Sequence, residues 1–201
     1  MSTVAPAFPL NPTTTTENAA TAALISALNM TAHPEGGYFV ETDRDSLRVP
    51  NPLKDSSGDT RSASTTIFYL LTAQRSVGRW HRNKARTVHT LHKGRGRYVI
   101  IHADEVGEGK TGRARVETFV VGQDVSKGER LQWIVEGGKY KTSFLLPDEE
   151  TGEESKEGLL ISETVVPGFE FEDHDFLRPE RLRQLVTPEQ AEELAWMLRK
   201  E

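Results

Sequence analysis

The sequence predicts an all-β protein, a single-domain jelly-roll β-barrel with a short helix near each terminus. About eight short runs rich in β-branched and aromatic residues follow one another, and turn-forming residues separate them. Helical patterns occur only near the two ends of the chain. Short strands at this spacing are typical of a β-sandwich or a barrel, and we favour the jelly roll.

Composition supports one folded domain and excludes several classes of protein. The chain has 201 residues, of which 36% are hydrophobic, and this is sufficient for one core. The net charge of −5, without a basic stripe, argues against nucleic-acid binding. There are no cysteines, so disulfides, thiolate metal sites and cysteine nucleophiles are excluded. Because the chain shows no long apolar run and no secretory signal, we expect a cytoplasmic protein without a membrane partner.

The N-terminal part predicts a tail followed by a helix. Residues 1–16 are rich in Pro and Thr and are expected to form a disordered tail, which leaves 17–201 as the folded domain. With Thr16 as the N-cap, apolar residues at helical spacing predict a helix over 17–30, namely Ala20, Ala23, Leu24 and Leu28.

The central stretch, residues 62–101, holds the densest β pattern. Before it, paired glycines form a turn that leads into a strand from Tyr38, and a polar loop is expected over 44–61. The stretch itself contains three β-rich runs joined by two turns. Four of the six histidines lie in it or just after it, which makes it the first place to look for a chemical centre: His81, His89, His92 and His102.

The remainder of the chain predicts further strands and a terminal helix. Turn residues separate four β-rich runs, at 115–121, 131–135, 140–146 and 159–166. The aromatic and acidic residues from Phe169 to Phe176 are expected to pack at an edge of the fold. Thr187 followed by Pro188 is a helix-start signature, and an apolar helical face follows it, formed by Leu194, Met197 and Leu198.

Four motifs occur in an order that resembles a known family. They are His33-Pro-Glu-Gly-Gly-Tyr-Phe39, Thr66-Ile-Phe-Tyr-Leu-Leu71, Trp80-His81-Arg82 and Val166-Pro-Gly-Phe-Glu-Phe-Glu-Asp173. Together, over residues 20–195, they resemble the cupin superfamily and, within it, the small single-domain cupin-5 family. The resemblance implies a jelly-roll barrel with a small-molecule ligand inside, usually assembled as a homodimer. It also implies a shape similar to that of sugar-nucleotide epimerases.

The resemblance indicates where a metal would bind. A metal-binding cupin presents a His-x-His pair, a Glu a few residues later and a final His on another strand. The matching positions here are Arg79, His81 and Arg86, and the region of the last ligand, 140–144, contains no histidine. Because a cation beside a metal is repulsive, we expect no metal and no cofactor. Strand alternation implies that if Arg86 points into the barrel, His89 points out.

Three residues of the central stretch are candidates for chemistry. His81 titrates near neutral pH and is a candidate general acid or base, and the alternative is a histidine that only packs. Arg86 is a candidate anchor for a carboxylate, phosphate or enolate oxygen, and the alternative is a surface ion pair. With Arg79 it would give the pocket a positive bias.

Four further residues are expected to line the pocket. The resemblance to the epimerases implies Tyr98 as a proton donor opposite His81, with a core position as the alternative. Glu35 and Tyr38 are expected at the pocket mouth, and Trp133 at an apolar wall against a ring-shaped ligand.

Three functional hypotheses follow. The first is a metal-independent enzyme that binds a small organic acid, sugar or natural-product intermediate and catalyses isomerisation, epimerisation or cyclisation by acid/base chemistry. The second is a non-catalytic, storage-like cupin that only binds a small ligand. The third is a metal-dependent cupin with unusual ligands.

Overall fold

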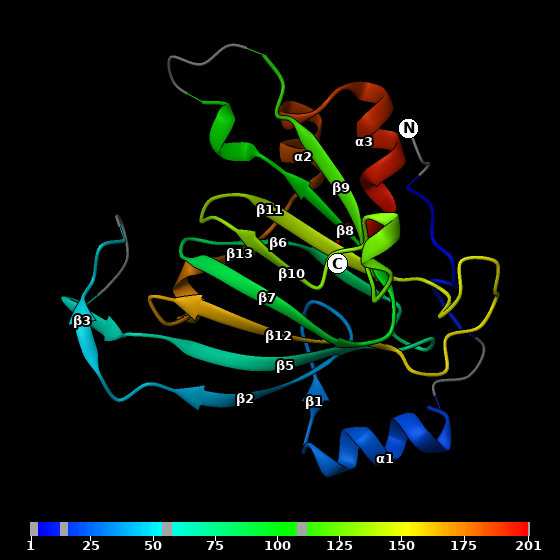
Figure 1. The fold of residues 1–201 in the computed structure, drawn as a ribbon. Coiled ribbons are helices and arrows are strands. Elements are labelled where there is room, and N and C mark those ends of the chain that lie inside the picture. The colour runs from blue at the N-terminus through cyan, green and yellow to red at the C-terminus, as the bar shows by residue number, and fades with distance from the viewer. Residues whose placement is uncertain (1–3, 13–15, 54–57, 108–111, 201) are drawn as a thin grey trace.

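Two antiparallel sheets face each other in the computed structural model, which describes residues 4–12, 16–53, 58–107 and 112–200 (Figure 1). The six-stranded sheet contains, in spatial order, β1 (Thr31–Ala32), β2 (Tyr38–Arg44), β5 (Thr65–Leu71), β12 (Leu159–Val166), β7 (Arg86–Lys93) and β10 (Gln132–Val135). The five-stranded sheet contains β13 (His174–Phe176), β6 (Val77–Asn83), β11 (Tyr140–Leu145), β8 (Gly96–Ile101) and β9 (Val116–Val121). A separate hairpin is formed by β3 (Arg48–Pro50) and β4 (Thr60–Ser62). The arrangement is the predicted jelly roll, although within the described residues no strand pairing closes the two sheets into one barrel.

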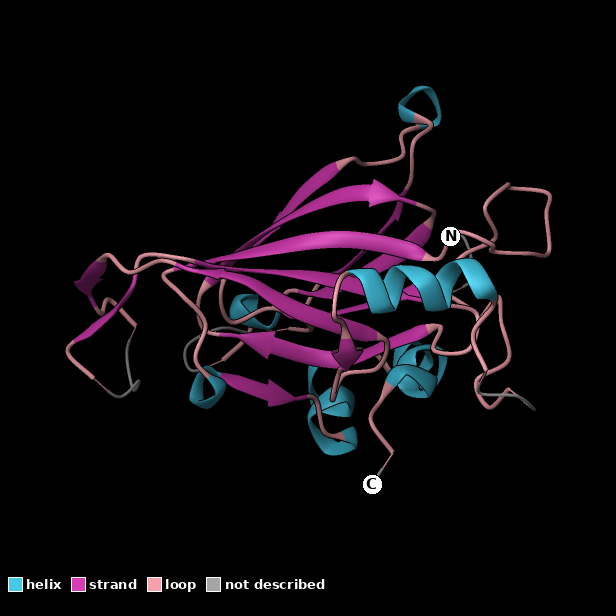
Figure 2. Cartoon of the chain, turned by 90° about the horizontal axis from the view of Figure 1, so that it is seen from below, coloured by secondary structure: helices cyan, strands magenta, loops and turns pink. Residues whose placement is uncertain are grey.

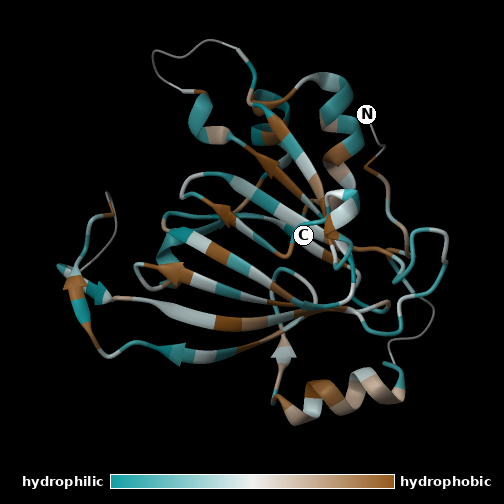
Figure 3. Ribbon diagram, in the orientation of Figure 1, coloured by the Kyte–Doolittle hydropathy of each residue, from teal (hydrophilic) through white to brown (hydrophobic). Residues whose placement is uncertain are grey.

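Alternation of side chains along the strands gives each sheet an inner and an outer face. In β7, Thr87, His89 and Leu91 are buried and the residues between them are not. Figure 3 shows the same alternation of hydrophobic and hydrophilic residues along several strands. The inner faces share an apolar cluster that includes Tyr98 and Trp133. Burial between the sheets therefore drives their packing.

Two C-terminal helices cover the outer face of the five-stranded sheet. α2 (Pro179–Leu185) and α3 (Pro188–Leu194) bury Leu182 in one cluster with Trp80 of β6 and Phe144 of β11. As predicted, Thr187 caps α3 and forms a capping box with Gln190.

The N-terminal helix, α1 (Ala19–Ala27), covers the other sheet. Leu24 packs against the buried side chains of Leu70 and Leu160. Viewed from below, this helix lies in front of the strands (Figure 2). Four single 3-10 turns complete the described elements: η1 (Ala103–Glu105), η2 (Val125–Lys127), η3 (Phe171–Asp173) and η4 (Ala195–Met197).

The N-terminal region differs from the prediction. Asn18, not Thr16, is the N-cap of α1, because the Asn18 side chain accepts a hydrogen bond from the backbone N–H of Thr21 at 2.9 Å. Residues 4–12 of the expected tail lie against the domain, where Val4 is buried and its backbone N–H donates to Glu193. Residues 1–3 and 13–15 of the expected tail lie outside the described part of the chain.

The chain also contains more elements than the sequence pattern predicts. The 44–61 region forms the β3–β4 hairpin, in which Arg48 donates across the ladder to Ser62 and to the Thr60 carbonyl. The central stretch contains four strands, because 77–83 and 86–93 are separate strands of different sheets. α2 has no counterpart in the prediction.

One glycine turn holds Glu35 against β6. Gly36 has a φ of +105°, and a Cβ on it would lie 2.1 Å from the carbonyl oxygen of Val77. The Gly36 carbonyl also accepts a hydrogen bond from the hydroxyl of Tyr69 at 2.9 Å. Only glycine fits this close approach, so the turn determines where Glu35 lies.

Replacing Gly36 should destabilise the fold more than replacing a glycine that has free space around it. We expect Gly36→Ala to lower the free energy of unfolding by about 2–4 kcal/mol, from left-handed backbone strain and from the clash with Val77. Gly138→Ala is the matched control, since its φ is +84° but no atom lies within 4 Å of the added Cβ. It should cost only about 1 kcal/mol in urea unfolding. Equal losses in the two variants would contradict the close approach at Gly36.

Candidate functional site

A pocket lies between the two sheets beside the loop that precedes β2. Glu35 of that loop, His81 of β6 and Glu163 of β12 contribute polar groups, and Phe169 and Phe171 contribute aromatic rings. Its cavity volume is about 80 Å³, and it reaches about 610 Å³ only when the open solvent at the mouth is included.

Three imidazoles surround the buried carboxylate of Glu35. His174 Nε2 lies 2.7 Å from Glu35 Oε1, and His81 Nδ1 lies 3.2 Å from Oε2. The rings of His81 and His174 stack with their centroids 5.3 Å apart. On the other side, His33 Nδ1 accepts a hydrogen bond from the Glu35 backbone N–H at 3.1 Å. The Glu35 carboxylate therefore links its loop to β6 and to β13.

The contacts of His81 define its protonation state. Its Nδ1 also lies 2.9 Å from the carbonyl oxygen of Arg79. Because both neighbours of Nδ1 are acceptors, we assign the hydrogen to Nδ1, which leaves a lone pair on Nε2. Burial is the main cause that lowers the pKa of His81 to about 4. The Glu35 carboxylate raises this pKa, and the nearby charges of Lys141 and His174 offset part of that increase. His81 is therefore a neutral base at pH 7.

Glu35 is ionised beside this base. Burial alone would raise its pKa, but His81, His174 and His33 together lower the pKa of Glu35 to about 2. If His81 takes up a proton, the imidazolium forms next to an existing carboxylate. This pairing is the arrangement that a general base needs in order to hold a proton transiently.

A second buried cluster joins β11, β7 and β12. Lys141 Nζ donates to His89 Nε2 at 2.8 Å and to Glu163 Oε2 at 2.7 Å. Burial and the Lys141 ammonium lower the pKa of His89. Although burial raises the pKa of Glu163, Lys141 and His89 hold it well below its usual range. The cluster is thus an ion pair beside a neutral imidazole. One of its members, Glu163, also lines the pocket.

Arg79 does not line the pocket, which corrects the prediction. The register between β6 and β11 shifts next to Arg79, and such a bulge turns consecutive side chains to one face. Arg79 donates to the Trp196 carbonyl at 3.0 Å, and its neighbour Trp80 donates to the Leu194 carbonyl at 3.2 Å. Both side chains therefore point toward the C-terminal helices.

The predicted orientation of β7 is also wrong. Arg86 has 48% of its side chain exposed and pairs with Glu136 at 3.2 Å on the outer face. His89 is fully buried and points inward. Arg86 and His89 do lie on opposite faces of β7, but the strand has the opposite phase from the one predicted. With both arginines outside, the expected positive bias of the pocket is absent.

Three other candidates lie away from the pocket lining. Tyr98 is 2% exposed in the inner apolar cluster, where burial raises its pKa well above the usual value. Trp133 stacks on His89 in the same core, at a centroid distance of 5.1 Å. Tyr38 donates to Glu17 beneath α1. Glu35 and His81 are the two predicted residues that do line the pocket.

The pattern missed Lys141, Glu163 and His174. Lys141 and Glu163 are charged residues within buried strands, and this departure from apolar alternation was the signal that could have found them. His174 follows an acidic and aromatic run that is typical of a surface edge. Nothing in the sequence indicates that it pairs with Glu35, 139 positions earlier.

The residues at the expected metal positions do not fit a metal ion. Arg79 and Arg86 point away from the pocket. In the region expected to supply the final histidine, Lys141 places an ammonium between an imidazole and a carboxylate. A cation held at this point opposes a metal rather than binding it.

Glu35, His81 and His174 do bring possible ligand atoms within 4.8 Å of one another. However, each oxygen of the Glu35 carboxylate already lies within hydrogen-bonding distance of an imidazole nitrogen. We interpret the cluster as a proton network in which His174 hydrogen-bonds one oxygen of Glu35 and His81 lies beside the other.

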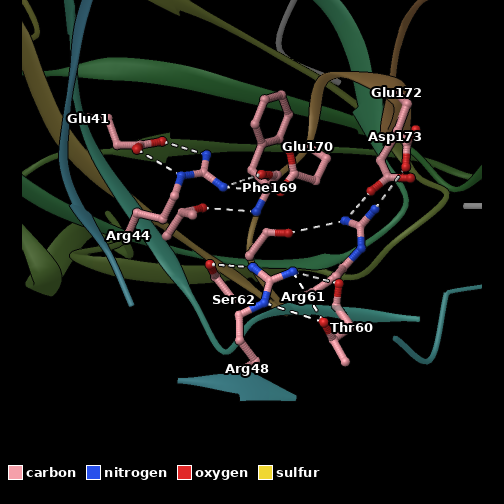
Figure 4. Close-up of polar contacts among 12 residues, drawn as sticks. Glu41, Arg44, Arg48, Thr60, Arg61, Ser62, Phe169, Glu170, Glu172 and Asp173 are labelled. Carbon is pink, nitrogen blue, oxygen red and sulfur yellow. Dashed lines mark hydrogen bonds and ion pairs between the residues drawn. The ribbon is translucent and has the colours of Figure 1, made fainter. Parts of the chain in front are cut away.

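Arginines fix the segment that carries Phe169 and His174 (Figure 4). Arg44 donates to the Phe169 carbonyl at 3.2 Å and pairs with Glu41 and Glu170. Arg61, whose side chain is 1% exposed, donates to the Gly168 carbonyl and pairs with Asp173. These contacts hold the segment between β12 and β13 at the pocket.

The two-sheet jelly roll with a polar pocket between its sheets is the architecture of a cupin. More particularly, residues 22–177 match the Cupin_5 family, described as Cupin superfamily (DUF985), and the chain belongs to this family. The predicted resemblance is confirmed. Within the described residues, no helix has the length and hydropathy needed to cross a membrane.

Similar proteins occur in distant organisms. The chain is 45% identical over 181 residues to uncharacterized protein YML079W of Saccharomyces cerevisiae, and the match covers 87% of this chain and 84% of that one. A hypothetical protein from Leishmania major has a TM-score of 0.74 and 27% identity, and the match covers 89% of this chain and 98% of that chain. Protein SO0799 from Shewanella oneidensis has a TM-score of 0.69 and 24% identity, with 92% and 100% covered. These likenesses give fold and family, so the functional argument rests on the site residues.

The buried imidazole should make stability depend on pH. The unfolded chain protonates His81 near its ordinary pKa of 6.5, whereas the folded chain does so near 4. The unfolded state therefore binds more protons in this window, and the free energy of unfolding falls as the pH decreases from 6.5 toward 4. Glu35 adds a loss in the same direction between its ordinary 4.5 and about 2.

His81→Gln should reduce this pH dependence, because glutamine does not titrate. We expect the difference in unfolding free energy between pH 7 and pH 5, measured in urea, to shrink by about 2 kcal/mol. His92→Gln is the control, since His92 is exposed. A His81→Gln variant with the same pH dependence as the original protein would refute the assignment.

Proposed function

We propose that this cupin is a proton-transfer enzyme that isomerises or epimerises a small molecule bound between its sheets. The single observation that supports it most is the buried Glu35–His81–His174 cluster at the pocket. It combines a neutral imidazole with an ionised carboxylate and a second imidazole. The cluster lies at a pocket between the sheets that both polar and aromatic side chains line.

His81 is the proposed base. Its Nε2 lone pair takes a proton from a substrate carbon adjacent to a carbonyl, and the electron pair moves to the carbonyl oxygen. The imidazolium that forms is stabilised by Glu35, whose other oxygen is held by His174. Return of the proton from His81 to a neighbouring atom gives the isomer, and protonation of the opposite face by a water molecule, with His81 releasing its proton to solvent, gives the epimer.

Asn83 is the proposed partner of the substrate oxygen. Its side chain lines the pocket on the same strand as His81, two residues away and therefore on the same face. An amide N–H is a neutral donor that can stabilise a developing oxyanion. This residue takes the role that the sequence pattern assigned to Arg86.

Hydrogen exchange tests this proposal on whichever compounds the pocket retains. Small molecules retained by the protein from a cell extract would be incubated with it in D₂O and analysed by mass spectrometry. We expect at least one retained compound to gain a carbon-bound deuteron. His81→Gln should slow this exchange by at least about a hundredfold, because the base is lost.

His92→Gln, which replaces an exposed histidine of β7, should exchange at the original rate. Exchange that persists in His81→Gln would place the base elsewhere. Retained compounds that show no exchange in the original protein would identify a binding protein instead of an enzyme.

A further inference from the structure

The pocket carries more carboxylates than cations. Among the described residues that line it, Glu35, Glu41 and Glu163 are acidic and Arg44 is the one lysine or arginine. Arg44 is already engaged, because it pairs with Glu41 at 2.9 Å and with Glu170 at 3.2 Å. An organic acid would therefore meet repulsion here without a free cation to hold it.

The two oxygens of Glu163 differ in their partners. Oε2 accepts a hydrogen bond from Lys141 and lies 3.3 Å from His89 Nε2, whereas Oε1 has no hydrogen bond to any described residue. The side chain is 9% exposed and lines the pocket. An unpartnered oxygen on a side chain that is only 9% exposed gains a hydrogen bond when a donor enters the pocket.

Two other residues of the pocket lining also carry acceptor atoms. The side-chain oxygen of Asn83 is buried and has no hydrogen-bond partner within the described chain. The Nε2 of His81 has a lone pair, because its Nδ1 faces two acceptors. Together with Glu163 Oε1, these atoms require a ligand that supplies hydrogen-bond donors.

Aromatic rings line the same pocket. Phe169 and Phe171 line the pocket with their centroids 5.3 Å apart, and Phe171 is 76% exposed. Phe39 lines the pocket from β2. Ring faces attract cations electrostatically and also pack against apolar groups.

We propose that the pocket selects small molecules that carry a protonated amine and an apolar portion, in preference to organic acids. The amine donates to Glu163 Oε1 and Asn83 Oδ1, and the apolar portion packs against Phe169 and Phe171. This inference rests on the same pocket as the proposed function and names its class of substrate.

Three probes of one shape test the charge preference. Benzylammonium, benzyl alcohol and benzoate share a ring and differ in charge, and their binding would be measured by calorimetry at pH 7.5. We expect benzylammonium to bind about tenfold more tightly than benzyl alcohol, and benzoate to bind most weakly. Benzoate that binds as tightly as benzylammonium would overturn the proposal.

Glu163→Gln should remove most of the preference for benzylammonium over benzyl alcohol, by about tenfold. Glu136→Gln is the matched control, because Glu136 is exposed and pairs with Arg86 on the outer face. An unchanged preference in Glu163→Gln, or an equal loss in Glu136→Gln, would also overturn the proposal.

A double variant guards against misfolding. Glu163→Gln leaves the Lys141 ammonium buried without its carboxylate, which is costly. Lys141→Met combined with Glu163→Gln removes both charges, and it should show the same loss of preference with a cooperative unfolding transition. Amine selectivity without His81-dependent exchange would support this inference and reject the proposed enzyme. His81-dependent exchange without amine selectivity would support the enzyme and reject this inference.

Discussion

Glu35 is a carboxylate buried between two sheets, and the site depends on the groups that keep it ionised. An isolated charge in this position would be strongly unfavourable, so the fold must supply hydrogen-bond donors around it. His81 comes from β6, His174 from β13, and the Gly36 turn brings Glu35 to both. The Arg61–Asp173 pair in turn fixes the segment next to His174. The loop, two strands and the pocket segment are thus coupled through one carboxylate.

Apolar side chains and charged side chains occupy different regions between the two sheets. Apolar side chains fill one region between the sheets, and Trp133 and Tyr98 belong to that core. The Lys141–Glu163 pair lies at its border, where Glu163 also reaches the pocket. The ammonium balances one carboxylate internally, and Glu35 and Glu41 add further carboxylates to the pocket lining. The pocket is therefore acidic, and its reactive group is a neutral imidazole.

The sequence predicted the fold, the family and a place for His81 and Glu35 in the pocket lining, because strand spacing and ordered motifs are local properties. The prediction failed where one local feature of a strand decides which sheet face its side chains occupy. A bulge turned Arg79 outward, and the phase of β7 exchanged the expected positions of Arg86 and His89. Neither can be read from alternation alone, since a shift of one residue reverses every side chain. His174 could not be paired with Glu35 because their contact depends on the complete topology.

The protonation state of His81 can be measured directly. Nitrogen-15 NMR of the imidazole resonances, assigned by comparison with His81→Gln, reports both the pKa and the tautomer. We predict a pKa of about 4 and a neutral ring with hydrogen on Nδ1 at pH 7. A pKa at or above the ordinary value of about 6.5, or hydrogen on Nε2 at pH 7, would contradict the account.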